Sequence, residues 1–168
     1  SSSKDRNLAI LNTSLIIKQK QEEILQANEI DIGNAKQKNL TDSFLDRLFL
    51  NHKRINDIIN GLKIIAEMDD PIGIELSRWK QPNGLDISRI SVPLGIIGII
   101  YESRPNVTID SGSLCIKSGN TVILRGGSDS INSSKILVTC LQKGLMSANL
   151  PAEAVQMIDD TDREAVTA

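Results

Sequence analysis

Three short apolar runs in the second half of the chain restrict its fold more than any other feature. They span residues 96–101, 121–124 and 154–158, and none alternates apolar with polar residues as a half-exposed strand does. Helical patterns over Pro105–Lys117 and Ser130–Ala148 separate them. Such runs joined by helices predict βαβ units around a buried parallel sheet. Right-handed connections should place the helices on the faces of that sheet.

The first 70 residues predict helices. Leu8, Leu11 and Leu15 recur at helical spacing and indicate an apolar face. The polar stretch Lys18–Glu23 is typical of a solvated helix face, and Asp31–Asn39 predicts a short helix. Thr41 and Asp42 are then suited to cap the next helix. The clearest helical stripe consists of apolar residues three or four apart: Ile55, Ile58, Ile59, Leu62, Ile65 and Ala66.

Residues 73–92 have a different pattern. Alternating side chains flank Pro82-Asn83-Gly84, a turn signal, and therefore predict a β-hairpin. Trp79 lies beside the turn and is best explained as a packing residue of the hairpin.

Composition restricts the partners. Aromatic residues are only 2% of the sequence, so Ile, Leu and Val must fill the core. The 19 basic and 21 acidic residues give a net charge of −2, which argues against nucleic acid or an anionic membrane surface. The first residues lack the apolar segment of a signal peptide, and we expect a cytoplasmic protein with a small-molecule or protein partner.

The segment from Tyr101 to Thr108 carries the first candidate site. Pro105 suits the first helical position, because its missing N–H would lack a partner there anyway. The amide of Asn106 would then lie beside free backbone N–H groups, where it could stabilise negative charge developing on a carbonyl oxygen. Glu102 and Arg104 bring both signs of charge to a strand end, where ligands bind in open α/β sheets. The alternative is an ordinary helix start with a surface ion pair.

A second loop, Arg125-Gly126-Gly127-Ser128-Asp129, follows the next predicted strand. Paired glycines allow a sharp turn and a close approach to a ligand. The planar guanidinium of Arg125 could bind phosphate or ribose oxygens, and Ser128 or Asp129 could cap the following helix. The loop matches no phosphate-binding fingerprint, so a tight strand-to-helix turn is the alternative.

The remaining reactive side chains favour no separate catalytic site. Cys115 and Cys140 lie within apolar helical patterns, where thiols are usually inert packing groups in a reducing cytosol. His52, the single histidine, is expected on the surface at a helix start. No spacing of His, Cys, Asp and Glu indicates a metal site.

The carboxyl end predicts a further helix. Thr161-Asp162-Arg163-Glu164 matches a capping box, yet the sequence ends at Ala168 after about one turn. We therefore expect an α/β sheet that is truncated within this chain. A frayed natural terminus is the alternative.

Much of the sequence resembles γ-glutamyl phosphate reductase, a family of the aldehyde dehydrogenase superfamily. The main matching stretches are residues 92–108, 113–120, 122–127, 150–156 and 162–164. Ala27-Asn28, Asp31 and Leu45-Asp46-Arg47-Leu48 also fit, so the resemblance covers nearly the whole chain.

The resemblance implies NADPH-dependent reduction of L-glutamate 5-phosphate to L-glutamate 5-semialdehyde and phosphate in L-proline biosynthesis. In this family a cysteine thiolate displaces phosphate, and hydride then reduces the thioester. That cysteine belongs to a catalytic domain that this sequence lacks, so the chain alone is expected to be inactive. Residues 1–168 would be a partial cofactor-binding domain, with a helical lead-in at 1–70, an oligomerisation hairpin at 73–92 and Rossmann-like βαβ units at 95–168.

The resemblance also implies roles for particular residues. Arg125 falls where the superfamily places a lysine that contacts the adenosine ribose, and Gly126, Gly127 and Ser128 continue that cofactor loop. Asn106 is the candidate for the oxyanion asparagine of the superfamily. From their place at the strand end, Glu102 and Arg104 are candidates for substrate binding. A homo-oligomer through the hairpin is expected. A naturally short, non-catalytic nucleotide-binding module or remnant remains the alternative, and the intact mass of the expressed protein discriminates the two.

Overall fold

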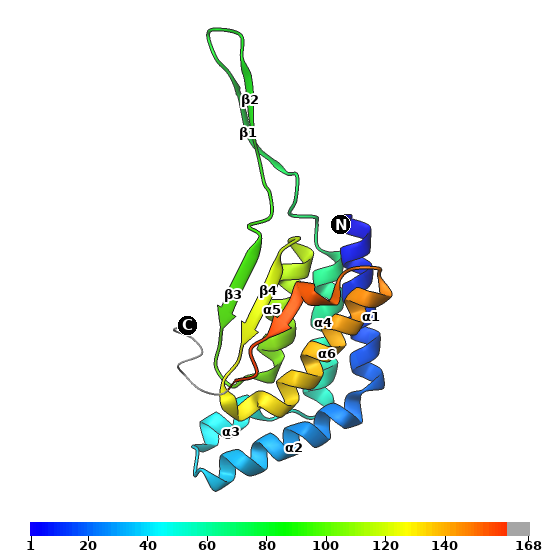
Figure 1. Cartoon of the computed structure of the whole chain (residues 1–168), viewed down its shortest axis with the longest axis vertical. Helices are drawn as coiled ribbons and strands as arrows, with labels where there is room; N and C mark the ends of the chain where they lie inside the picture. Colours follow the sequence, from blue (N-terminus) through cyan, green and yellow to red (C-terminus); the bar gives the residue numbers. More distant parts are fainter. Residues whose placement is uncertain (161–168) are drawn as a thin grey trace.

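The computed structural model describes residues 1–160 and combines packed helices, a small parallel sheet and a projecting hairpin (Figure 1). The helices are α1 (Ser3–Gln19), α2 (Gln21–Gln37), α3 (Asp42–Leu48), α4 (His52–Glu67), α5 (Pro105–Lys117) and α6 (Ile131–Ser147). The strands are β1 (Glu75–Lys80), β2 (Asp86–Ile90), β3 (Ile96–Ile100), β4 (Thr121–Arg125) and β5 (Val155–Met157). The predicted α/β fold class is confirmed. The predicted capping box at Thr161–Glu164 lies outside the described residues.

The parallel sheet is covered on one face. Its order is β3-β4-β5, so both connections step in the same direction. Right-handed connections that step the same way put their helices on the same side, and α5 indeed packs against α6. Val122 and Leu124 of β4 are buried on that side.

The opposite face of the sheet is exposed among residues 1–160. Ile96 and Ile100 of β3 are 76% and 66% exposed, and Ile123 of β4 is also exposed. The expectation of a sheet buried on both faces is therefore wrong for the described chain, because both helices lie on the same side.

Packing of α1 corrects a second expectation. Its apolar stripe was predicted from Leu8, Leu11 and Leu15, but all three are exposed. The buried face mixes apolar, small and polar residues: Arg6, Ala9, Ile10, Thr13, Ser14 and Ile17. Helices α1 and α6 cross closely at Ala9 and Thr13, where a Cβ on Gly144 would lie 2.7 Å from the carbonyl oxygen of Ala9. Small side chains face α6 at this crossing, whereas Ile10 and Ile17 fill other parts of the buried face. The stripe on α4 is buried as predicted.

The boundaries of the first helices also differ from expectation. The polar stretch Lys18–Glu23 is not a single helix face, because α1 ends at Gln19 and α2 begins at Gln21. The short helix predicted over Asp31–Asn39 is the second half of α2. Thr41 caps α3 as predicted, since its hydroxyl accepts a hydrogen bond from the N–H of Phe44 at 3.3 Å.

Asn28 is a fully buried polar residue of α2 that fixes the α3–α4 connection. Its side-chain nitrogen donates to the carbonyl oxygen of Leu48 at 2.9 Å and to Oγ of Ser133 at 3.1 Å. Its side-chain oxygen accepts from the N–H of Leu50 at 2.7 Å. One amide thus holds α2, the start of α4 and the start of α6 in fixed positions.

The hairpin of β1 and β2 extends away from the rest of the molecule (Figure 1). Its turn is closed by the N–H of Gly84 donating to Gln81 at 2.9 Å, and Gly84 has a φ of 88° that favours glycine. Trp79 lies opposite Ile87, as expected for a packing residue of the hairpin. Both strands are almost wholly exposed. Within residues 1–160, no helix is long and apolar enough to cross a lipid bilayer.

Candidate functional site

The two candidate loops meet at the carboxyl ends of β3 and β4. The N–H of Tyr101 donates to the carbonyl oxygen of Arg125 at 3.0 Å. A Cβ on Gly127 would lie 2.1 Å from Oγ and 2.8 Å from the backbone nitrogen of Ser103, and one on Gly126 would touch the Tyr101 ring at 3.0 Å. Gly127 is therefore required for contact between the loops, while a side chain at Gly126 would push the Tyr101 ring aside.

Arg125 and Ser128 place hydrogen-bond donors at this edge. Arg125 ends the central strand, is half-buried, and donates from Nη1 to the carbonyl oxygen of Gly126 at 3.4 Å. Ser128 is exposed at the start of a short 3₁₀ turn, Ser128–Ser130. Guanidinium and hydroxyl groups at a strand end suit ribose or phosphate oxygens.

The start of α6 is capped by a residue from another helix. Asp31 of α2 is buried, and its carboxylate accepts from the N–H groups of Asn132 at 3.2 Å and Ser133 at 2.9 Å. It also accepts from the side chains of both residues. A carboxylate thus occupies the positive end of α6, which in other α/β proteins can bind a phosphate.

The expectation that Ser128 or Asp129 caps α6 is therefore wrong. The 3₁₀ turn shifts the helix start so that Ser130 takes the N-cap position, without a side-chain capping bond. Asp129 instead pairs with Lys38 at 2.6 Å.

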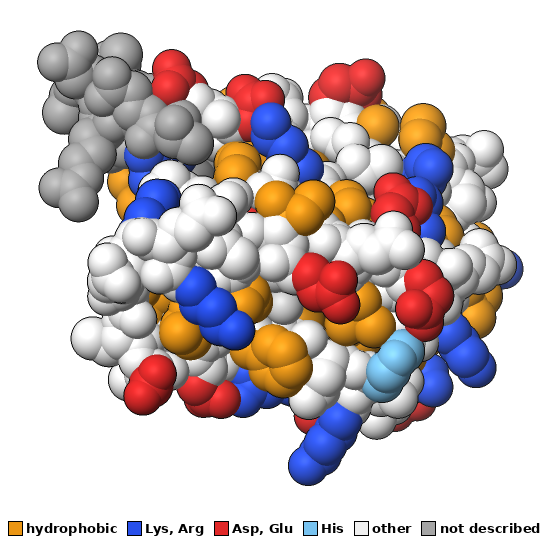
Figure 2. Space-filling model, turned by 90° about the horizontal axis from the view of Figure 1, so that it is seen from below, with side chains coloured by type: hydrophobic (Ala, Val, Ile, Leu, Met, Phe, Trp, Pro, Cys, Tyr) orange, Lys and Arg blue, Asp and Glu red, His pale blue; other side chains and the backbone are white. Residues whose placement is uncertain are grey.

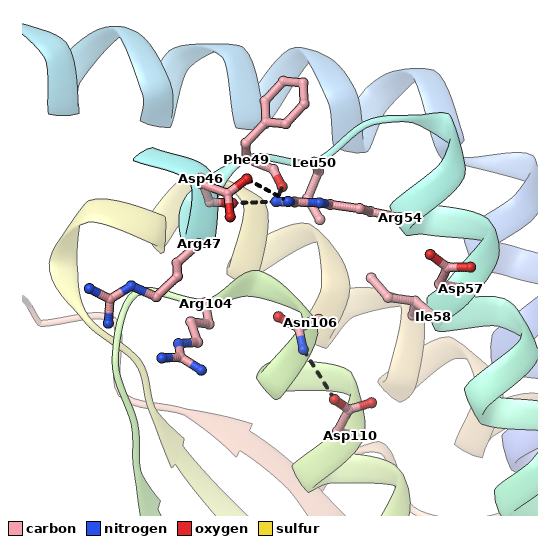
Figure 3. A pocket seen from close by; sticks show the side chains of 10 residues that line it. All are labelled: Asp46, Arg47, Phe49, Leu50, Arg54, Asp57, Ile58, Arg104, Asn106 and Asp110. Carbon is pink, nitrogen blue, oxygen red and sulfur yellow. Dashed lines mark hydrogen bonds and ion pairs between the residues drawn. The ribbon is translucent and has the colours of Figure 1, made fainter. Parts of the chain in front are cut away.

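A pocket of about 400 Å³ lies between α3, α4 and the start of α5 (Figure 3). Its lining carries charges of both signs around a small apolar floor: Asp46, Arg47, Phe49, Leu50, Arg54, Asp57, Ile58, Arg104, Asn106 and Asp110. Two residues expected from the sequence, Arg104 and Asn106, are among them. Figure 2, viewed from the α2–α3 end, shows acidic, basic and apolar side chains interspersed on that face of the molecule.

The Arg54 side chain makes contacts that hold the pocket wall together. Its guanidinium pairs with the Asp46 carboxylate at 2.6 Å and donates to the carbonyl oxygen of Phe49 at 2.8 Å. It also lies 5.8 Å from the centre of the Phe49 ring. These contacts fix the pocket wall between α3 and α4.

Glu102 bridges two other arginines. Its carboxylate lies 3.2 Å from Arg47 of α3 and 3.2 Å from Arg104 at the start of α5. All three side chains are exposed. The surface ion pair that the sequence left open as an alternative is present, and it includes a third partner, Arg47, from α3.

Asn106 faces the pocket from the first turn of α5. Pro105 begins this helix, as predicted. The Asn106 side-chain nitrogen donates to the Asp110 carboxylate at 3.3 Å, a weak bond that leaves its second N–H available. Burial raises the pKa of the Asp110 carboxyl, and the bond from Asn106 offsets this only in part.

The two thiols are poor nucleophiles in this structure. Burial raises the pKa of Cys115, and it raises the pKa of Cys140 to about 11. At neutral pH both are therefore protonated, and a protonated thiol does not attack an acyl group. His52 is exposed at the start of α4. In the part of the chain that the structure describes, no three His, Cys, Asp or Glu side chains form a potential metal cluster.

Sequence reasoning singled out only Arg104 and Asn106 among the ten residues that line this pocket. Asp46 and Arg47 entered only as part of a matching stretch, while Arg54, Asp57 and Asp110 were not considered. A signal was present for Asp110, since it lies four residues after Asn106 and hence on the same helix face. The residues of α3 and α4 could not be found in this way, because tertiary packing alone brings those helices next to α5.

Two comparisons with known proteins, one of sequences and one of structures, found the same family of enzymes. No family model matches the sequence. A γ-glutamyl phosphate reductase from Mesorhizobium japonicum is 50% identical over 161 residues, which are 96% of this chain and 38% of the relative. The crystal structure of the Thermotoga maritima γ-glutamyl phosphate reductase superposes with a TM-score of 0.94 at 41% identity, over 99% of this chain and 40% of that one.

More distant structures share the fold. An NAD-dependent benzaldehyde dehydrogenase from Corynebacterium glutamicum superposes with a TM-score of 0.71 at 20% identity, over 94% of this chain and 32% of that one. The aldehyde dehydrogenase-like fold is thereby confirmed. The chain spans about two fifths of the length of the reductases it matches.

The buried cap on α6 gives a first testable prediction. Asp31→Asn keeps the size of the side chain but turns an NH₂ group toward donors on Asn132 and Ser133. We expect the free energy of unfolding to fall by about 1.5–3 kcal/mol, the usual value of hydrogen bonds to a charged group. Urea unfolding followed by circular dichroism measures it. Asp86→Asn, in an exposed hairpin ion pair, is the matched control; equal stability of the two variants would contradict the capping role.

Proposed function

Because the chain is homologous over nearly its whole length to the amino-terminal part of γ-glutamyl phosphate reductases, we propose that it supplies the cofactor side of such an enzyme. The reaction is the NADPH-dependent reduction of L-glutamate 5-phosphate to L-glutamate 5-semialdehyde and phosphate, in L-proline biosynthesis. The observation that carries the proposal is the junction of two candidate loops at the carboxyl ends of β3 and β4. A cytoplasmic location suits its two free, buried thiols.

NADPH would be held by the second loop. The Arg125 guanidinium and the Ser128 hydroxyl are suited to donate to ribose and phosphate oxygens, and Gly126 and Gly127 keep this loop against Tyr101 and Ser103. The cofactor supplies a hydride when bound. Its pyrophosphate would have to lie away from the start of α6, because the Asp31 carboxylate already takes those donors.

The substrate would approach from the first loop. Asn106 is our candidate oxyanion donor, through the side-chain N–H that Asp110 leaves available. Glu102 and Arg104 lie on the same rim. The nucleophile would come from a separate catalytic domain, because Cys115 and Cys140 are buried and protonated. Residues 1–168 would then form a partial cofactor-binding domain that is inactive alone.

The role of Arg125 is testable in a reductase that has this sequence as its amino-terminal part. Arg125→Ala should weaken NADPH binding by about tenfold or more, because a charge-assisted hydrogen bond contributes about 1.5–3 kcal/mol. Fluorescence titration with NADPH measures the dissociation constant, and steady-state reduction of L-glutamate 5-phosphate measures the activity. Arg89→Ala on the hairpin is the control. Unchanged affinity would remove Arg125 from the site, and NADPH binding without reductase activity would favour a non-catalytic nucleotide-binding module.

The hairpin is our candidate for self-association. A two-stranded sheet is marginal in water by itself, and β1 and β2 expose apolar side chains on both faces. Leu76 is 56% and Trp79 is 45% exposed. A second copy that paired with the hairpin would cover these side chains and the unpaired strand edges.

We therefore expect a dimer or higher oligomer at tens of micromolar. Light scattering on freshly purified protein measures the mass. The double substitution Leu76→Ser and Trp79→Ser should shift the mass toward the monomer, whereas Ile64→Ser, which alters an exposed apolar residue on α4, should not. A stable monomer of the unaltered chain would rule out assembly through the hairpin.

A further inference from the structure

Four hydroxyl groups form a continuous hydrogen-bonded chain next to the contact between the two candidate loops. This hydroxyl chain begins at Tyr101, directly after β3, whose hydroxyl lies 2.8 Å from Oγ1 of Thr108 on α5. Thr108 donates to Oγ of Ser134 on α6 at 3.3 Å, and Ser134 donates to Oγ of Ser130 at 3.4 Å. Ser130 donates to the carbonyl oxygen of Gly127 at 3.2 Å. The hydroxyl chain therefore connects the first loop with the second through two helices.

All four hydroxyl groups donate in the same direction. A threonine hydroxyl has one proton, and Thr108 donates it to Ser134, so Tyr101 is the donor in its bond with Thr108. Thr108, Ser130 and Ser134 are fully buried. Burial raises the pKa of Tyr101, which keeps the phenol protonated at neutral pH and hence able to donate. In such a chain each bond polarises the next, and a buried hydroxyl without a partner is unfavourable, so removing one hydroxyl affects its neighbours.

Tyr101 also contacts the second loop directly. A Cβ on Gly126 would lie 3.0 Å from Cζ and from the hydroxyl oxygen of Tyr101. The second loop is therefore held at two points, by the Tyr101 ring at Gly126 and by the hydroxyl chain at Gly127. The Gly127 carbonyl oxygen also accepts from the N–H of Ser130 at 3.2 Å. Because these contacts form a closed ring, the second loop cannot shift relative to β3 without breaking a hydrogen bond or moving Tyr101.

Members of this ring lie next to the two groups on which the proposed reaction depends. Thr108 follows Asn106 by two residues on α5, and Gly127 follows Arg125 by two residues. Hydride transfer requires accurate placement of the reacting groups, and an error of about 1 Å can lower a rate about a hundredfold. A constraint between Asn106 and Arg125 would act on this placement rather than on the strength with which either ligand binds.

We propose that the four residues of the hydroxyl chain are positioning residues for the reductase reaction, which fix the cofactor loop relative to Asn106. They act through the Gly127 carbonyl oxygen on one side and through α5 on the other. The inference rests on the proposed function, because Asn106 and Arg125 are its candidate groups. It adds a mechanical link between the two candidate sites, which the proposed function by itself does not require.

The test uses a reductase that has this sequence as its amino-terminal part. Thr108→Val keeps the shape of the side chain but removes its hydroxyl, whereas Thr108→Ser keeps the hydroxyl. Thr108→Val should lower kcat for L-glutamate 5-phosphate about tenfold or more and leave both KM values within about twofold, because placement is affected rather than binding. Thr108→Ser should restore most of the rate. With NADPH deuterated at the transferred position, the isotope effect on kcat should rise in Thr108→Val, because hydride transfer becomes the slow step.

Thr139→Val is the matched control, since the Thr139 hydroxyl donates to the carbonyl oxygen of Lys135 at 2.9 Å on the exposed side of α6. Circular dichroism during heating checks that each variant is folded at the assay temperature. Tyr101→Phe removes only the first donor of the hydroxyl chain and should also lower kcat, so the role stays testable if Thr108→Val unfolds.

Three results would overturn the positioning role: an unchanged kcat in Thr108→Val and Tyr101→Phe, an equal loss in Thr139→Val, or a loss that Thr108→Ser does not restore. Each of these leaves the reductase activity of the unaltered enzyme in place, so the proposed function would stand. Absence of reductase activity in the unaltered enzyme would instead contradict the proposed function, and the positioning role with it.

Discussion

Two buried polar residues on α2 hold the parts of the molecule on which the rest depends. Asn28 fixes the backbone between α3 and α4, and Asp31, three residues later, caps α6. Burying such groups is unfavourable unless their hydrogen bonds are made, so their partners must return to the same positions whenever the chain folds. The α3–α4 connection forms a wall of the charged pocket, and the start of α6 follows the loop proposed for the cofactor. One helix therefore positions both candidate sites.

The contact between the two candidate loops explains why they share one edge. Parallel strands end at the same side of a sheet, and Gly126 and Gly127 allow the second loop to lie directly on Tyr101 and Ser103. A larger side chain at Gly127 would separate the loops, and with them the proposed cofactor site from the proposed substrate site. The uncovered sheet face and the projecting hairpin share one property. Each exposes large apolar side chains that a further partner could cover.

Sequence patterns predicted the fold well where one periodicity dominated. The β-hairpin, the βαβ units and the inward stripe of α4 followed from alternation and helical spacing. The inward face of α1 did not, because α6 crosses α1 closely at Gly144, where Ala9 and Thr13 face it, and Leu8 and Leu15 lie outside the contact. The cap on α6 could not be found locally, since its carboxylate lies about a hundred residues away in the chain. Of the pocket, the sequence offered only Arg104 and Asn106, which lie in one loop, whereas helix packing brings Arg47 and Asp57 to them.

We propose that cofactor and substrate bind this chain at two adjacent but distinct places. A titration of isotopically labelled chain, followed by backbone amide NMR, tests it directly. NADPH should shift the amide signals of residues 125–130, and L-glutamate should shift those of residues 46–54 and 102–110. Shifts confined to the hairpin or to α1, or the same set of shifts with both ligands, would contradict the account.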